Sequence, residues 1–135
     1  SDIFQIESVR RRFTKRLHSM WSLSYLERLT VLNVDSLQLR RLKSDLIMIY
    51  KIVNNLVDIN DNIITASTFN INLRRHSKYL VKPKTNRNCR FFSFACRNID
   101  VWNSLPNYMV DINNLSSFKH NLNKINFSKY LCLTN

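Results

Sequence analysis

Apolar residues recur along the first part of the chain at the three- and four-residue steps of an α-helix. The clearest repeat steps 3-4-3-4-3 and predicts a long helix over residues 36–56. Its members are Leu39, Leu42, Leu46, Ile49, Val53 and Leu56. A second stripe predicts a helix over residues 3–20, and its members are Ile6, Val9, Phe13, Leu17 and Met20. Both stripes are expected to face the core.

Cap signals separate these helices. Ser24 is followed three residues later by Glu27, a capping-box pattern that predicts a short helix through about Leu32. Asp35 followed by Gln38 gives a similar start for the long helix. Three helices with short links predict a small antiparallel bundle over residues 1–57.

The middle of the chain, residues 58–88, has a weaker pattern. Residues 69–74 alternate apolar and polar side chains, which is the period of a half-buried strand. Residues 79–81 fit a second strand that ends before Pro83, since proline has no backbone N–H to donate. A short hairpin and an irregular basic loop both agree with this pattern.

The last third returns to helix. One helix ends at about Leu105, because Pro106 disfavours helical backbone in the residue before it. Asn114 is expected to open a final helix. The apolar positions of these two helices are Phe92, Cys96, Ile99 and Trp102, then Leu115, Phe118, Leu122 and Ile125. The expected fold is therefore mainly α: the three-helix bundle, then a basic loop or short hairpin and two further helices over residues 58–135, packed as one compact unit.

Composition changes this picture in two ways. The chain of 135 residues has no glycine, so its turns must use the next residue that tolerates positive φ, which is Asn. Asn33, Asn54 and Asn55 stand at expected helix ends. The three cysteines have no CxxC spacing, which disfavours a disulfide framework or a zinc site and agrees with a reducing intracellular setting.

The net charge of +12 makes polyanions the expected partners, with nucleic acid first and an anionic membrane surface second. Residues 62–99 hold eight Lys or Arg and no Asp or Glu. The eight are Arg74, Arg75, Lys78, Lys82, Lys84, Arg87, Arg90 and Arg97. Such a window favours phosphate contacts over a merely solvated loop. Its aromatic residues, Tyr79, Phe91 and Phe92, are expected to pack in the core rather than stack on bases.

Six motifs follow one another in a characteristic order. They are Val9 to Leu17 (VRRRFTKRL), Leu23 to Leu29 (LSYLERL), Leu39 to Ile47 (LRRLKSDLI), Phe91-Phe92-Ser93, Val101 to Pro106 (VWNSLP) and Ser117-Phe118-Lys119. This succession resembles the carboxy-terminal segment of jockey-like, non-LTR retrotransposon reverse transcriptases, from about Ile6 to about Ile125. One departure concerns Leu73-Arg74-Arg75-His76, where the family usually has Thr-Arg-Gly-His, so the tight turn of the family is in doubt here.

The resemblance implies the thumb and following part of an RNA-directed DNA polymerase, as a fragment of a longer protein. Its role would be to grip RNA template and DNA through the phosphate backbone. The upstream palm and fingers would be its protein partners, and no membrane or small-molecule substrate is expected. Its setting would be cytoplasmic and nuclear. The expected nucleic-acid contacts are Arg11, Arg12, Lys15, Arg74, Arg75, His76, Lys78, Lys82, Lys84, Arg87, Arg90 and Arg97.

No catalytic residue is predicted in this chain. Polymerases hold two metal ions with paired carboxylates, and no Asp-Asp occurs in the sequence. The resemblance places the magnesium site in the upstream palm, so no cofactor is expected here. His18, His76 and His120 are isolated from carboxylates at helical spacing. No polymerase activity is expected from the chain alone.

Two other functions stay open at this point. The first is a free-standing DNA-binding module, with Arg40, Arg41 and Lys43 on a recognition-type helix. The second is a structural interaction domain, or an inactive fragment of a decayed mobile element, whose positive charge is incidental.

Overall fold

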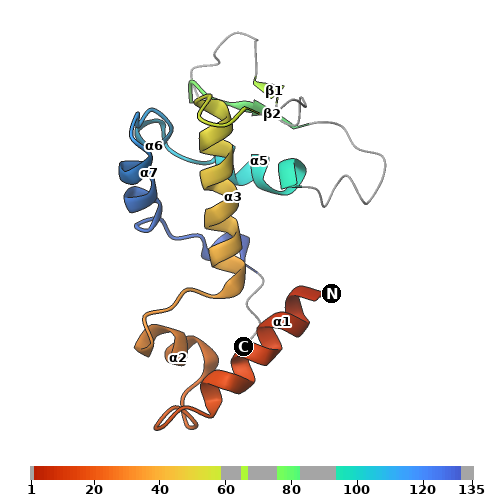
Figure 1. Cartoon of the computed structure of the whole chain (residues 1–135), viewed down its shortest axis with the longest axis vertical. Coiled ribbons are helices and arrows are strands. Elements are labelled where there is room, and N and C mark those ends of the chain that lie inside the picture. Colours follow the sequence, from red (N-terminus) through yellow and green to blue (C-terminus); the bar gives the residue numbers. More distant parts are fainter. Residues whose placement is uncertain (1, 59–64, 67–75, 83–93, 132–135) are drawn as a thin grey trace. The chain divides into compact units, whose positions relative to one another are not determined.

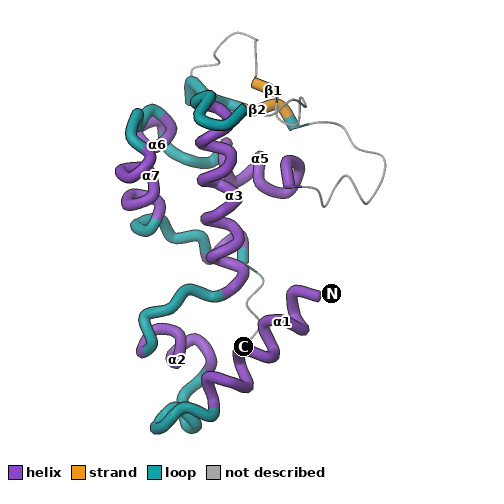
Figure 2. The backbone as a smooth tube through the Cα atoms, in the orientation of Figure 1, coloured by secondary structure: helices purple, strands orange, loops and turns teal. Residues whose placement is uncertain are grey.

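The computed structural model describes residues 2–58, 65–66, 76–82 and 94–131. Its described part is mainly helical, as the sequence predicts (Figures 1 and 2). The helices are α1 (Asp2–Lys15), α2 (Tyr25–Val31), α3 (Leu37–Val53), α5 (Phe94–Asn103), α6 (Asn107–Val110), α7 (Leu115–Leu122) and the 3-10 helix η1 (Ser128–Tyr130). The strands are β1 (Thr65–Ala66) and β2 (Leu80–Val81).

The chain forms two compact units, and their boundary differs from the predicted one. Residues 1–41 and 127–135 form the first unit, and residues 42–126 form the second. The predicted bundle over 1–57 assigned all of α3 to the first helices. In the structure the body of α3 belongs with the carboxy-terminal helices instead, because its buried side chains Leu46, Ile49 and Tyr50 pack in the core of the second unit.

The turns of the first unit show how a chain without glycine ends its helices. α1 ends at Lys15, five residues before the predicted end, and Ser19 has φ 63° in the segment that follows. The capping box of α2 is confirmed: Ser24 N donates to Glu27 Oε2 at 2.7 Å, and Glu27 N donates to Ser24 Oγ at 3.3 Å. The hydrogen bonds that the Glu27 carboxylate accepts, first from the backbone and then from the side chain of Ser24, lower the pKa of Glu27. After α2, Asn33 adopts φ 50°, the left-handed conformation expected of Asn.

The side of α1 that is buried differs from the predicted one. Its apolar residues Ile6, Val9 and Phe13 were expected in the core, but they are 60%, 65% and 65% exposed. Among the α1 side chains that the structure describes, Glu7 and Thr14 are the buried ones. The physical reason is that the neighbouring elements present polar groups, so hydrogen bonding rather than hydrophobic periodicity fixes the orientation of α1.

The start of α3 also differs in its cap. The sequence suggested Asp35 as the capping residue, but Ser36 makes the capping contact, with its Oγ accepting from Leu39 N at 3.2 Å. Glu7 of α1 adds a second acceptor there, because Leu37 N donates to Glu7 Oε2 at 3.2 Å. The first turn of α3 is thus hydrogen-bonded to α1 within the first unit.

The second unit is built around α3. Tyr50 of α3 stacks on Phe118 of α7 with ring centroids 4.3 Å apart, and the Tyr50 hydroxyl donates to the carbonyl oxygen of Ile112 at 2.6 Å. Figure 1 draws α6 and α7 on one side of α3 and α5 on the other. The predicted core residue Trp102 of α5 is confirmed as fully buried, and its Nε1 donates to the carbonyl oxygen of Lys78 at 2.9 Å.

Several boundaries in the second unit agree with the sequence. Pro106 interrupts the helix as predicted, although it also begins the short α6, which the pattern did not predict. Asn114 caps α7, with its Oδ1 accepting from Ser116 N at 2.8 Å. β2 lies within the predicted strand 79–81 and pairs antiparallel with β1. The predicted strand over 69–74 lies outside the described residues.

Candidate nucleic-acid interface

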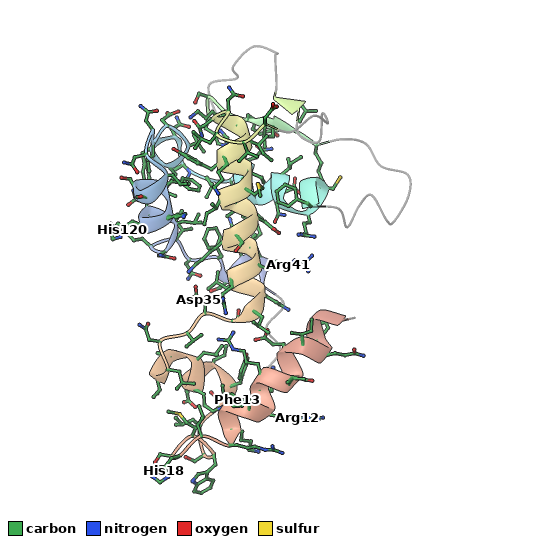
Figure 3. The ribbon with its side chains drawn as sticks, in the orientation of Figure 1. Arg12, Phe13, His18, Asp35, Arg41 and His120 are labelled. Carbon is green, nitrogen blue, oxygen red and sulfur yellow. The ribbon has the colours of Figure 1, made fainter. Side chains whose placement is uncertain are left out.

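The basic side chains predicted on α1 lie in two different environments. Arg12 and Lys15 are exposed, and Figure 3 shows Arg12 extending away from the ribbon. Arg11 is half-buried, and its guanidinium carbon lies 4.9 Å from the ring centroid of Tyr25. Arg12 and Lys15 can therefore reach a ligand directly, whereas Arg11 is engaged in a cation–π contact inside the first unit.

The basic window is only partly within the described residues. Arg74, Arg75, Lys84, Arg87 and Arg90 lie outside them. Lys78, Lys82 and Arg97 lie inside them, and so does His76, which was also predicted to contact nucleic acid.

Two of these cations are neutralised by carboxylates from outside the window. Lys82 Nζ forms an ion pair with Asp100 Oδ2, and Arg97 forms one with Asp45, with Nη2 at 2.7 Å from Oδ2. The sequence indicated a window without local neutralisation, and at these positions that prediction is wrong. The reason is that Asp100 follows directly after the window, while α3 brings Asp45 to α5 from far along the chain.

Lys78 and His76 have structural roles in the second unit. Lys78 Nζ donates to Asn54 Oδ1 and to the carbonyl oxygen of Val110, both at 2.8 Å. His76 is only 4% exposed, and its Nε2 donates to the carbonyl oxygen of Trp102 at 3.1 Å. Burial lowers the pKa of His76, so the ring is neutral at physiological pH. A buried neutral imidazole offers no charge to a phosphate.

The chain uses many of its carboxylates for internal contacts. Glu27 caps α2, Asp45 and Asp100 pair with the cations named above, and Asp111 Oδ1 accepts from Ser77 Oγ at 2.7 Å. Glu7 is buried and accepts a hydrogen bond from the Tyr25 hydroxyl. These carboxylates are therefore engaged within the fold.

The exposed surface keeps a large number of cations. In the first unit these include Arg12, Lys15, Arg16, Arg40 and Arg41, and in the second unit Lys119 and Lys124. Sequence reasoning gave Arg40 and Arg41 a role in the alternative DNA-binding module. It did not select Lys119 or Lys124, although both stand between the apolar positions of the predicted last helix.

The described residues contain no group of three or more His, Cys, Asp or Glu side chains arranged to hold a metal ion. Among them, no helix has both the length and the apolar character needed to cross a bilayer. Comparisons of the chain with protein-family models, with curated proteins and with solved structures found no match.

Proposed function

We propose that this chain is a non-catalytic module that binds RNA and DNA through their phosphate backbones, as the thumb and carboxy-terminal part of a non-LTR retrotransposon reverse transcriptase. The motif succession described above supports the polymerase assignment. The partners would be primer–template or element RNA, together with the palm and fingers of the same polyprotein.

One structural observation carries the nucleic-acid part of this proposal. Many carboxylates of the fold are held by internal hydrogen bonds and ion pairs, while cations such as Arg12, Lys15, Arg40 and Arg41 stay exposed. Each cation that neutralises a phosphate releases condensed counterions, and this release drives binding. Phosphate contacts of this kind hold a duplex without reading its sequence.

The test is to measure the affinity of the whole chain for an RNA–DNA hybrid at several salt concentrations. We expect log Kd to rise linearly with log salt, and hybrids of scrambled sequence to bind equally well. An affinity that does not change with salt would overturn the proposal. A strong preference among duplex sequences would instead support the free-standing DNA-binding module, with Arg40 and Arg41 in the groove.

Paired variants sharpen this test. Replacing Arg12 and Lys15 together by Gln is expected to reduce the salt slope by about 1 to 2, since each lost phosphate contact removes roughly 0.7 to 0.9. Replacing Lys82 by Gln is the matched control, because its charge is already paired with Asp100. Equal effects of the two changes would contradict the assignment of α1 to the binding surface.

A further inference from the structure

The exposed apolar stripe of α1 is held outward by hydrogen bonds on one flank of the helix. Glu7 accepts from the hydroxyl of Tyr25, and Thr14 Oγ1 accepts from Arg28 Nε at 3.2 Å. All four of these side chains are buried. Turning α1 to bury its apolar residues would leave these polar groups without partners, which is costly in a buried site. The outward stripe is therefore a fixed feature of the first unit.

The geometry of this stripe is that of a helix–helix contact. Ile6, Val9 and Phe13 are spaced by three and then four residues, which corresponds to positions a, d and a of a heptad. A stripe confined to a and d is the narrow seam of a coiled coil. Helices that lie on a membrane instead present a broad apolar face, with a strongly charged face opposite. Here the buried Glu7 and Thr14 lie on one flank of the helix, and the exposed Phe4 and Lys15 lie on the far side from this seam, so the seam itself is only as wide as positions a and d.

Charge beside the seam indicates the chemistry of the partner. Arg12 falls at position g, where side chains of paired helices form ion pairs, and the exposed Arg16 follows shortly after the seam. Among the α1 side chains that the structure describes, Glu7 is the one carboxylate, and it is buried. A second copy of this chain would bring the same cations to the contact and be repelled. An acidic border on the partner would be attracted.

We propose that the seam of Ile6, Val9 and Phe13 binds an amphipathic helix of a protein partner, and that carboxylates border the apolar seam of that helix. This interaction goes beyond the proposed binding of nucleic acid, although Arg12 takes part in both. It uses apolar side chains that phosphate contacts leave uncovered.

Two synthetic peptides provide the probes. Both are about three heptads long with Leu at a and d, and they carry either Glu or Lys at every e and g position. Like charges keep each peptide from pairing with itself. Fluorescence anisotropy of labelled peptide, titrated with the whole chain, gives the affinity. We expect the Glu peptide to bind at least about tenfold more tightly than the Lys peptide.

Variants of the chain locate the contact. Val9→Ser and, separately, Phe13→Ser are each expected to weaken binding of the Glu peptide about tenfold, as truncation of a central interface residue does. Val31→Ser is the matched control, because Val31 is a valine on α2 that is 60% exposed. Arg12→Glu is expected to reverse the preference between the two peptides. Far-UV circular dichroism checks that each variant keeps its helices.

Four results would overturn the proposal. The first is equal binding of both peptides or of neither. The second is binding that both seam variants leave unchanged. The third is a Val9-dependent attachment to phosphatidylserine vesicles without peptide binding, which would assign the seam to a membrane. The fourth is a concentration-dependent dimer in sedimentation that Val9→Ser abolishes, which would assign it to a second copy.

Discussion

Arg97 of α5 forms an ion pair with Asp45 of α3, with Nη2 at 2.7 Å and Nε at 3.1 Å from the same carboxylate oxygen, Oδ2. The side-chain amide of Asn98 donates to that oxygen as well, at 2.9 Å. The pair joins residues 52 positions apart in the sequence. A residue predicted to contact phosphate thus links two helices of the second unit.

Arg97→Ala is expected to lower the free energy of unfolding by about 1.5 to 3 kcal/mol, the usual contribution of a hydrogen bond to a charged group. The reason is that Asp45, whose side chain is only 15% exposed, would lose its counter-charge. Urea titration followed by circular dichroism measures this change. Arg41→Ala, at an exposed position, is the control. Equal stability of the two variants would show that the ion pair contributes nothing.

Tyr25→Phe is expected to destabilise the first unit by about 1 to 3 kcal/mol at neutral pH, because the buried Glu7 carboxylate loses a donor. Tyr108→Phe is the control, since Tyr108 is 66% exposed. Urea titration of both variants provides the comparison. If the two changes cost the same, the Tyr25–Glu7 hydrogen bond has no net effect.

The raised pKa of Tyr25 leads us to expect a loss of stability in alkali. Burial, followed by the hydrogen bond and the negative charge of Glu7, raises the pKa of Tyr25 from 10.0 to about 12. A raised pKa stabilises the folded state below pH 10, and this contribution disappears as the pH rises from about 10 to about 12. We expect Tyr25→Phe to remove that part of the pH dependence in denaturation curves taken across this range. An unchanged profile would contradict the assigned shift.

The buried His76 leads us to expect that the protein loses stability in acid. Burial lowers its pKa below the ordinary value of 6.5, so the unfolded chain takes up a proton first as the pH falls. Stability is therefore full above pH 6.5 and decreases below it. Protonation would also place an N–H at Nδ1, which has no hydrogen-bond partner among the residues that the structure describes. His76→Gln should flatten the dependence of the urea midpoint on pH, whereas His120→Gln, at an exposed position, should not.

Asn55 ends the turn after α3 with φ 55°, where a side chain with a Cβ is strained. Asn55→Ala is expected to cost about 1 kcal/mol, and Asn55→Gly is expected to be neutral or slightly stabilising, because glycine adopts this conformation freely. Asn123 has φ −70° and serves as the control, since Asn123→Ala introduces no such strain. Thermal or urea denaturation distinguishes the variants. A stable Asn55→Ala protein would contradict this account.

Features set by neighbouring residues could be predicted from the sequence, whereas features set by contacts between distant residues could not. The helix caps at the start of α2 and α7 were predicted, because a cap depends on neighbours within three residues. They are formed by Ser24 with Glu27 and by Asn114. The pairing of Lys82 with Asp100 and of Arg97 with Asp45 was missed, because a window of sequence does not show which carboxylates approach in space.

The sequence by itself determined the helical class, the caps of α2 and α7, the Asn-based turns and the large excess of positive charge, because local backbone preferences and composition set all of these. Only the tertiary structure decided that α1 presents Ile6, Val9 and Phe13 to solvent and directs Glu7 inward. Periodicity shows that a helix has an apolar side, but the groups packed against that helix decide which side is buried. Here the hydroxyl of Tyr25 and the guanidinium of Arg28 fix the orientation of α1, through hydrogen bonds that form only when the chain folds.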